Sequence, residues 1–187
     1  ENFQDRKRHK GGGTEQKVTF ICKEGTNTYH TKFSIWGFQY AKVETDIDLS
    51  TAHFESIAVY SAMEQIGHFS CGNADVNQLV HNSIWSQKSN FCDVPTDCPT
   101  RERAAWTGDA GVFVDTGIFL EDCYSIFRKW LGECRLMQYD DGKIANIAPL
   151  NSKPSFFSGL LSGSTGWGDA CIIVPYALYK RYDDVRI

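Results

Sequence analysis

A stretch of sixteen residues from Val94 to Asp109, VPTDCPTRERAAWTGD, combines acidic, basic and aromatic side chains at short spacing. Glycoside hydrolysis needs one carboxylic acid to protonate the leaving oxygen and one carboxylate on the other side of the sugar. Sugar sites also use indole faces against C–H groups and carboxylates as acceptors for hydroxyls. On composition alone, a solvated loop with surface salt bridges is the better interpretation. The side chains concerned are Asp97, Arg101, Glu102, Arg103, Trp106 and Asp109.

The elements around this stretch indicate a loop that enters a helix. Pro95 and Pro99 disfavour helix, and Thr107-Gly108-Asp109 resembles a helix start. Apolar spacing close to 3.6 residues predicts helices on both sides, with Asn73 or Asp75 capping the first. A long stretch rich in Gly, Ser and Pro separates the last two of them. The expected helices are 74–90, 108–119, 121–138 and 169–182.

Before residue 70 the pattern changes to short runs that alternate between apolar and polar residues, which is typical of strands. We expect the last part of an antiparallel sandwich, with too few strands to close one. The four candidate strands are 18–22, 32–35, 38–44 and 54–60.

Charge and cysteine usage narrow the class of protein. The net charge of −4 argues against nucleic acid as the partner, because phosphate binders present a basic face. No apolar run is long enough for a membrane span, and the start lacks the apolar core of a signal peptide. The seven cysteines form no CxxC pair, so we expect mostly buried free thiols. We also expect no metal site and no cofactor. The compartment is expected to be cytoplasmic or periplasmic.

The stretch resembles the signature of the α-L-rhamnosidases of glycoside hydrolase family 78. Asp97 to Arg103 followed by Trp106 to Asp109 is a shorter form of that family's DCPxRxERxGWTGD, with Ala104-Ala105 as the departure. Further matches lie on both sides of the stretch in the family's order, at 67–73 before it and at 138–144 and 166–170 after it. The resemblance covers roughly residues 30 to 183.

The resemblance implies a mainly α fold. Residues 1–66 would end a β-sandwich domain, and residues 67–187 would form the first part of an (α/α)6 barrel catalytic domain. The expected function is removal of terminal α-L-rhamnose from glycosides or polysaccharides with inversion, completed by the remainder of the same enzyme. A non-catalytic carbohydrate-binding protein and another glycosidase with this barrel are the alternatives.

The resemblance also assigns roles to single residues. Glu102 would be the general acid, and nearby negative charge or desolvation would have to raise its pKa. At least one of Arg101 and Arg103 is therefore expected to face away from it, toward Asp97 or Asp109. Asp169 would either join the site or cap its helix. The helical spacing of Trp85 and Trp130, by contrast, predicts that both pack in the core. The expected substrate-binding residues are Asp97, Arg101, Trp106, Asp109, Trp167 and Asp169.

Overall fold

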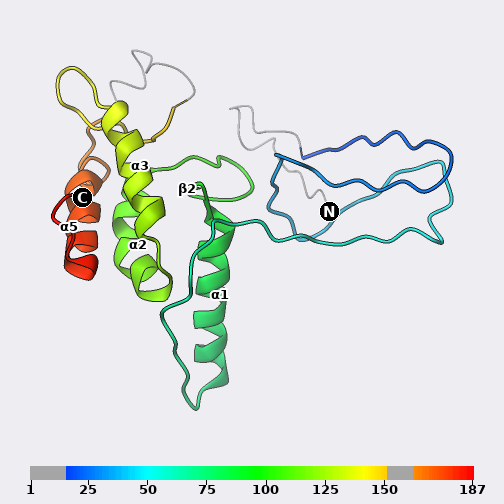
Figure 1. Ribbon diagram of the computed structural model, residues 1–187, viewed down its shortest axis with the longest axis horizontal. Helices are drawn as coiled ribbons and strands as arrows, with labels where there is room; N and C mark the ends of the chain where they lie inside the picture. The colour runs from blue at the N-terminus through cyan, green and yellow to red at the C-terminus, as the bar shows by residue number, and fades with distance from the viewer. Residues whose placement is uncertain (1–15, 151–161) are drawn as a thin grey trace.

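The protein is described by a computed structural model that covers residues 16–150 and 162–187. The described residues are mainly helical, as the sequence predicts. Figure 1 shows the helices side by side in one body, with the chain before α1 extending away from it. The elements are α1 (Ala74–Asn90), β1 (Phe91–Cys92), β2 (Val94–Pro95), α2 (Thr107–Leu120), α3 (Tyr124–Leu136) and α5 (Ala170–Tyr182).

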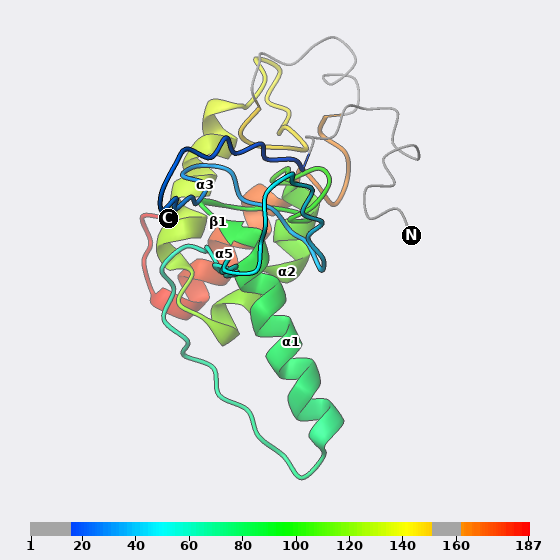
Figure 2. The same cartoon turned by 90° about the vertical axis from the view of Figure 1, so that its right-hand side faces the viewer.

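Local signals explain where the helices begin and end. The Asn73 side chain caps α1 by accepting hydrogen bonds from the backbone N–H groups of Asp75 and Val76. Figure 2 shows the preceding chain running beside this helix and turning into its first residue. α5 ends where Asp183 takes up the left-handed conformation at φ 54°. The predicted ranges differ from the observed helices by at most three residues at an end.

The core is built from aromatic and small side chains of α2, α3 and α5. Phe91 lies edge-on to Phe127, with ring centroids 5.5 Å apart, and Phe127 and Trp130 have no exposed surface. The Trp130 Nε1–H donates to the Ala148 carbonyl oxygen at 2.8 Å, which ties the loop after α3 to this core. The prediction of core packing is confirmed for Trp130 and wrong for Trp85, which is 43% exposed.

All seven cysteines are free thiols. Only Cys123 and Cys134 are buried, so the prediction that most of the thiols are buried is wrong. None of the helices in the described part of the chain is long and apolar enough to cross a membrane.

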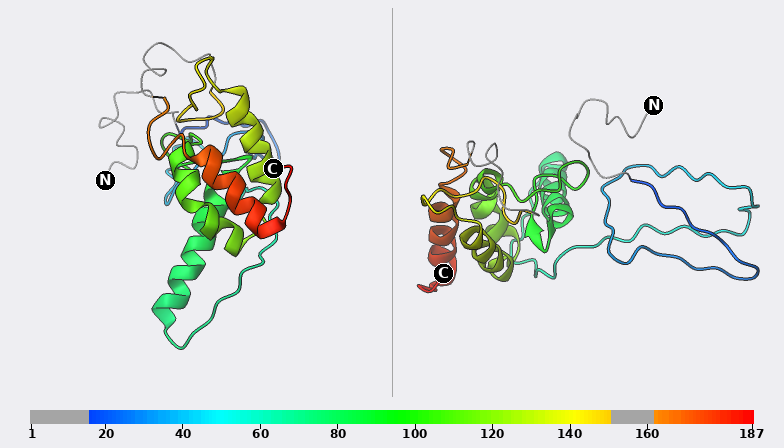
Figure 3. Two further views of the ribbon diagram at one scale, coloured as in Figure 1. Left: turned by 90° about the vertical axis from the view of Figure 1, so that its left-hand side faces the viewer. Right: turned by 90° about the horizontal axis from the view of Figure 1, so that it is seen from above.

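The predicted sandwich strands are absent from residues 16–64, which contain all four candidate strands. Figure 3 shows extended loops without a sheet in this segment, and the nearby bridge between Gln65 and Glu121 is isolated. A strand needs a hydrogen-bonded neighbour and a face to bury. In residues 16–64 no strand pairing occurs, and no face is buried at Ile21 and Phe33, which remain 87% and 95% exposed. The assignment of residues 1–66 to a separate domain stays a prediction, and residues 1–15 lie outside the described part.

A buried ion pair joins α1 to the residue that follows α2. The Glu121 carboxylate has no exposed surface and lies 3.4 Å from Lys88 Nζ. Burial raises the pKa of Glu121, and the nearby Lys88 ammonium only partly opposes this rise. The folded chain therefore binds this proton more tightly than the unfolded chain does. The stabilisation from this proton is complete below the pKa that Glu121 has in the unfolded chain. It is lost as the pH rises through the pKa that Glu121 has in the folded chain.

We predict that Glu121→Gln flattens the pH dependence of the free energy of unfolding from about pH 4 upward. The variant should be more stable than the native chain at pH 8, because the neutral amide avoids burying a charge. Urea unfolding at pH 4, 6 and 8 measures this. Glu133→Gln is the matched control, since Glu133 is partly exposed and lies 3.8 Å from Lys129. If the free energy of unfolding of Glu121→Gln depended on pH in the same way as that of the native chain, the prediction would be contradicted.

Candidate active site

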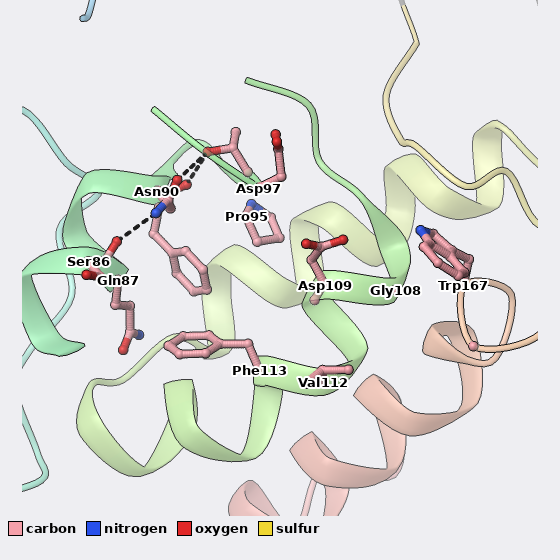
Figure 4. Close-up of a pocket in the computed structure, with 14 residues that line it drawn as sticks. Ser86, Gln87, Asn90, Pro95, Asp97, Gly108, Asp109, Val112, Phe113 and Trp167 are labelled. Carbon is pink, nitrogen blue, oxygen red and sulfur yellow. Dashed lines mark hydrogen bonds between the residues drawn. The ribbon is translucent and has the colours of Figure 1, made fainter. Parts of the chain in front are cut away.

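A cavity of about 550 Å³ opens between the end of α1 and the start of α2. This volume is in the range of small-molecule sites. Figure 4 shows Ser86, Gln87 and Asn90 at one end of the cavity, with Phe113 below. Asp109 and Trp167 lie at the other end, with Asp97 at the upper edge.

Asp109 presents a free carboxylate to this cavity. It lies in the first turn of α2, where the helix dipole favours a negative charge. Its carboxylate points into the space between Pro95 and Trp167 (Figure 4). Within residues 16–150 and 162–187 it has no hydrogen-bond or ion-pair partner. It is therefore available to accept from a bound ligand.

Trp167 forms a wall of the cavity because Gly108 has no side chain. A Cβ on Gly108 would lie 3.0 Å from three atoms of the Trp167 ring system, so the indole packs directly on the first turn of α2. The turn before α5 is closed by Asp169, whose Oδ2 accepts from the Gly166 N–H at 2.9 Å. Asp169 occupies the N-cap position of α5 without capping it through its side chain. Its observed contact positions the turn that carries Trp167.

Asp97 closes the loop that carries Glu102. Its Oδ1 accepts from the Ala104 N–H at 3.0 Å, and its own N–H donates to the Ala104 carbonyl oxygen at 2.9 Å. These two bonds form a clasp across residues 98–103. Asp97 also lines the cavity, and its carboxylate makes the structural contact with Ala104.

Glu102 is held at two points inside this loop. Its Oε2 accepts from Trp106 Nε1 at 2.9 Å, and its backbone N–H donates to Cys98 Sγ at 3.3 Å. The side chain is 44% exposed, and Arg101 Nη2 lies 3.9 Å from its Oε1. Glu102, Arg101 and Trp106 do not belong to the lining of the cavity. They lie on the loop that begins at its edge.

The backbone on either side of Trp106 is fixed by the loop after α3. The Thr107 N–H donates to the Asn146 carbonyl oxygen at 2.9 Å, and the Ala148 N–H donates to that of Ala105 at 3.1 Å. Ala105, Thr107 and Ala148 are all buried. Hydrogen bonds shielded from water in this way hold the start of α2 rigidly.

The structure thus gathers Asp97, Asp109 and Trp167 around one cavity and leaves the other predicted site residues beside it. Within the described residues, Arg103 forms no ion pair with Glu102, and it pairs with neither Asp97 nor Asp109. Its Nε and Nη2 are buried without a hydrogen-bond partner. The described residues contain no group of three or more His, Cys, Asp and Glu side chains that could hold a metal ion.

Sequence reasoning missed four contributors to the site. Gly108 and Cys98 lie within the recognised stretch and could have been found by asking why a small residue and a thiol stand there. Asn90 and Phe113 line the cavity from two helices. Their helical spacing carries no signal that distinguishes them from core residues.

We predict that Asp97→Ala opens the loop that carries Glu102. Loss of the bond to Ala104 costs about 1 kcal/mol, so cleavage by trypsin after Arg101 and Arg103 should accelerate roughly fivefold. Mass spectrometry of a digestion time course identifies these two cleavages. Asp97→Asn keeps an acceptor at the Oδ1 position, so trypsin should cleave it at the same rate as the native chain. Equal rates in Asp97→Ala and the native chain would show that the clasp does not hold the loop.

The sequence and the fold are both similar to those of known proteins. Residues 64–187 match the family profile of the bacterial alpha-L-rhamnosidase 6 hairpin glycosidase domain. An alpha-L-rhamnosidase of Formosa agariphila is 37% identical over 170 residues, which are 89% of this chain and 18% of that protein. One of Streptomyces avermitilis is 34% identical over 172 residues, which are 90% of this chain and 16% of that protein.

Solved structures agree with this match. The crystal structure of the Streptomyces avermitilis alpha-L-rhamnosidase complexed with L-rhamnose superposes with a TM-score of 0.62 at 36% identity, over 67% of this chain and 12% of that one. The structure of the alpha-L-rhamnosidase from Dictyoglumus thermophilum gives a TM-score of 0.60 at 35% identity, over 67% of this chain and 14% of that one. The chain therefore spans less than a fifth of the length of these relatives.

Proposed function

The chain belongs to the bacterial α-L-rhamnosidase six-hairpin glycosidase family, and from this premise we propose that it forms the general-acid part of an enzyme that removes terminal α-L-rhamnose with inversion. The relatives it matches are more than five times as long as the matched segment. In this proposal the segment acts as one portion of an (α/α)6 barrel, and the rest of the enzyme completes the site.

The observation that carries the proposal is the free Asp109 carboxylate beside the Trp167 indole in one cavity. Asp109 would accept hydrogen bonds from rhamnose hydroxyls, since an ionised carboxylate offers only acceptors. The flat face of Trp167 would pack against C–H groups of the ring. Rhamnose is a 6-deoxy sugar, so its methyl group suits the apolar surface of Phe113 and Phe91, which also line the cavity.

Glu102 is the proposed general acid. It would donate its proton to the glycosidic oxygen as the bond to the anomeric carbon breaks, and the bonding electrons would pass to that oxygen. Inversion then requires a carboxylate on the far face of the sugar, about 6.5–9.5 Å from the acid, to take a proton from the attacking water. We propose that another part of the enzyme supplies this base. Arg101 and Asp97 remain proposed contacts to the sugar.

We predict that Glu102→Gln in the complete enzyme lowers kcat by about 10²- to 10⁴-fold on methyl α-L-rhamnoside, whose leaving group needs protonation. The loss should be much smaller on the 2,4-dinitrophenyl rhamnoside, whose leaving group departs as a stable anion. Steady-state kinetics on both substrates test this, with Glu133→Gln as the control. Near-normal turnover of the methyl glycoside by Glu102→Gln would remove Glu102 from the role. A panel of other aryl glycosides tests the choice of sugar.

We further predict that the 187-residue chain by itself releases no p-nitrophenol from p-nitrophenyl α-L-rhamnoside, because the proposed base lies elsewhere. Release is followed by absorbance against a complete rhamnosidase as positive control. Turnover comparable with that of the complete enzyme would contradict the division of the site proposed above.

A further inference from the structure

We propose that Trp106 is a positioning residue for Glu102. Its indole N–H fixes the carboxyl group so that Oε1 carries the transferred proton and Oε2 does not. This inference rests on the proposed function of Glu102 as general acid, and it adds a role for the Trp106 N–H to the substrate-binding role that the family resemblance implies for Trp106.

The geometry separates Trp106 from the cavity and joins it to Glu102. Trp106 is not among the residues that line the cavity, whereas Trp167 is. Its Nε1 lies 2.9 Å from Glu102 Oε2, the distance of a well-formed hydrogen bond. The polar end of the Trp106 indole is therefore directed at the proposed acid.

Trp106 is the rigid partner of this pair. Its backbone forms a bridge with Ile147, and its carbonyl oxygen accepts from the Ala110 N–H at 3.2 Å in the first turn of α2. Glu102 lies on an exposed loop and has a free choice of side-chain rotamer unless another group restrains it. The hydrogen bond thus restrains the Glu102 carboxyl group relative to the start of α2.

The chemistry of the indole decides which oxygen carries the proton. An indole N–H can only donate, so Oε2 serves as the acceptor both before and after proton transfer. The proton of the acid form is then on Oε1 and moves from there to the glycosidic oxygen. Two other groups face Glu102: Arg101 Nη2 lies 3.9 Å from Oε1, and the Cys98 thiol accepts from the Glu102 backbone N–H. Arg101 is 58% exposed, so its attraction is screened by water.

The same bond favours the transfer itself. As the proton leaves, negative charge develops on the carboxylate, and a hydrogen bond to a charged acceptor is stronger than one to a neutral acceptor. The Trp106 N–H therefore binds the product carboxylate more tightly than the starting acid. An interaction that strengthens along the reaction lowers the barrier.

The first test uses the chain itself. In ¹⁵N-labelled protein, the Trp106 Nε1–H resonance should shift with pH as Glu102 ionises, and Glu102→Gln should abolish the shift. The resonance of Trp130, whose Nε1 is buried and bonded to Ala148, is the internal control and should stay constant. A Trp106 resonance that does not titrate, or that titrates equally in Glu102→Gln, overturns the inference.

The second test uses the complete enzyme. Trp106→Phe keeps an aromatic ring and removes the donor, so kcat on methyl α-L-rhamnoside should fall about 10- to 100-fold with little change in KM. The loss on the 2,4-dinitrophenyl rhamnoside should be much smaller. The matched control is Trp167→Phe, which should raise KM for both substrates.

The outcomes separate the inference from the proposed function. An equal loss on both substrates with a raised KM would make Trp106 a wall of the pocket and overturn the inference, even when Glu102→Gln discriminates between leaving groups as expected. If Glu102→Gln shows no such discrimination, the proposed role of Glu102 fails whatever Trp106 does in the first test.

Discussion

The start of α2 depends on a short set of hydrogen bonds between residues 105–107 and the loop at 145–148. The Thr107 side chain adds to the two backbone bonds by donating to the Asn146 carbonyl oxygen at 3.1 Å. Because this contact is buried, breaking it would leave polar groups without partners away from water, at about 1–3 kcal/mol each. Trp106, Gly108 and Asp109 all take their positions from it. The proposed acid and the cavity thus share one anchor.

Close packing of α2 on α5 brings a distant residue into the same site. A Cβ on Gly111 would lie 3.4 Å from the Ala170 Cβ, so small side chains allow the two helices to approach. One turn earlier along α2, Gly108 leaves room for the Trp167 indole. Trp167, a cavity wall that lies 59 residues after Gly108 in the sequence, is therefore positioned by two glycines on one helix.

The helices could be predicted from sequence because their signals are local. Asn73 caps α1 through its own side chain, and the two prolines before α2 disfavour a helix there. The strands could not be predicted reliably, since alternation at 38–44 and 54–60 only becomes a sheet when a neighbouring strand pairs with it. For the site, residue types alone favoured a solvated loop, and it was the family resemblance that selected Asp109 and Trp167. The contacts of Asp97 with Ala104 and of Trp106 with Glu102 depend on how the loop folds back, which spacing alone does not determine.

The loop that carries Glu102 contains one residue with an unfavourable backbone conformation. Arg103 has φ 51°, a left-handed conformation that is unfavourable for a residue with a side chain. Such a residue costs on the order of 1–3 kcal/mol and persists only where its surroundings enforce it. The two Asp97–Ala104 bonds enclose this strained residue and contribute about 1 kcal/mol each, so they offset a strain of this size. The clasp and the Trp106 donor therefore act on the two sides of Glu102: one holds the backbone of the loop, and the other orients the carboxyl group. Both contacts lie within residues 97–106, whereas the cavity also needs Trp167 from the turn before α5. The orientation of the proposed acid and this wall of the cavity are therefore set by two segments that meet at the start of α2.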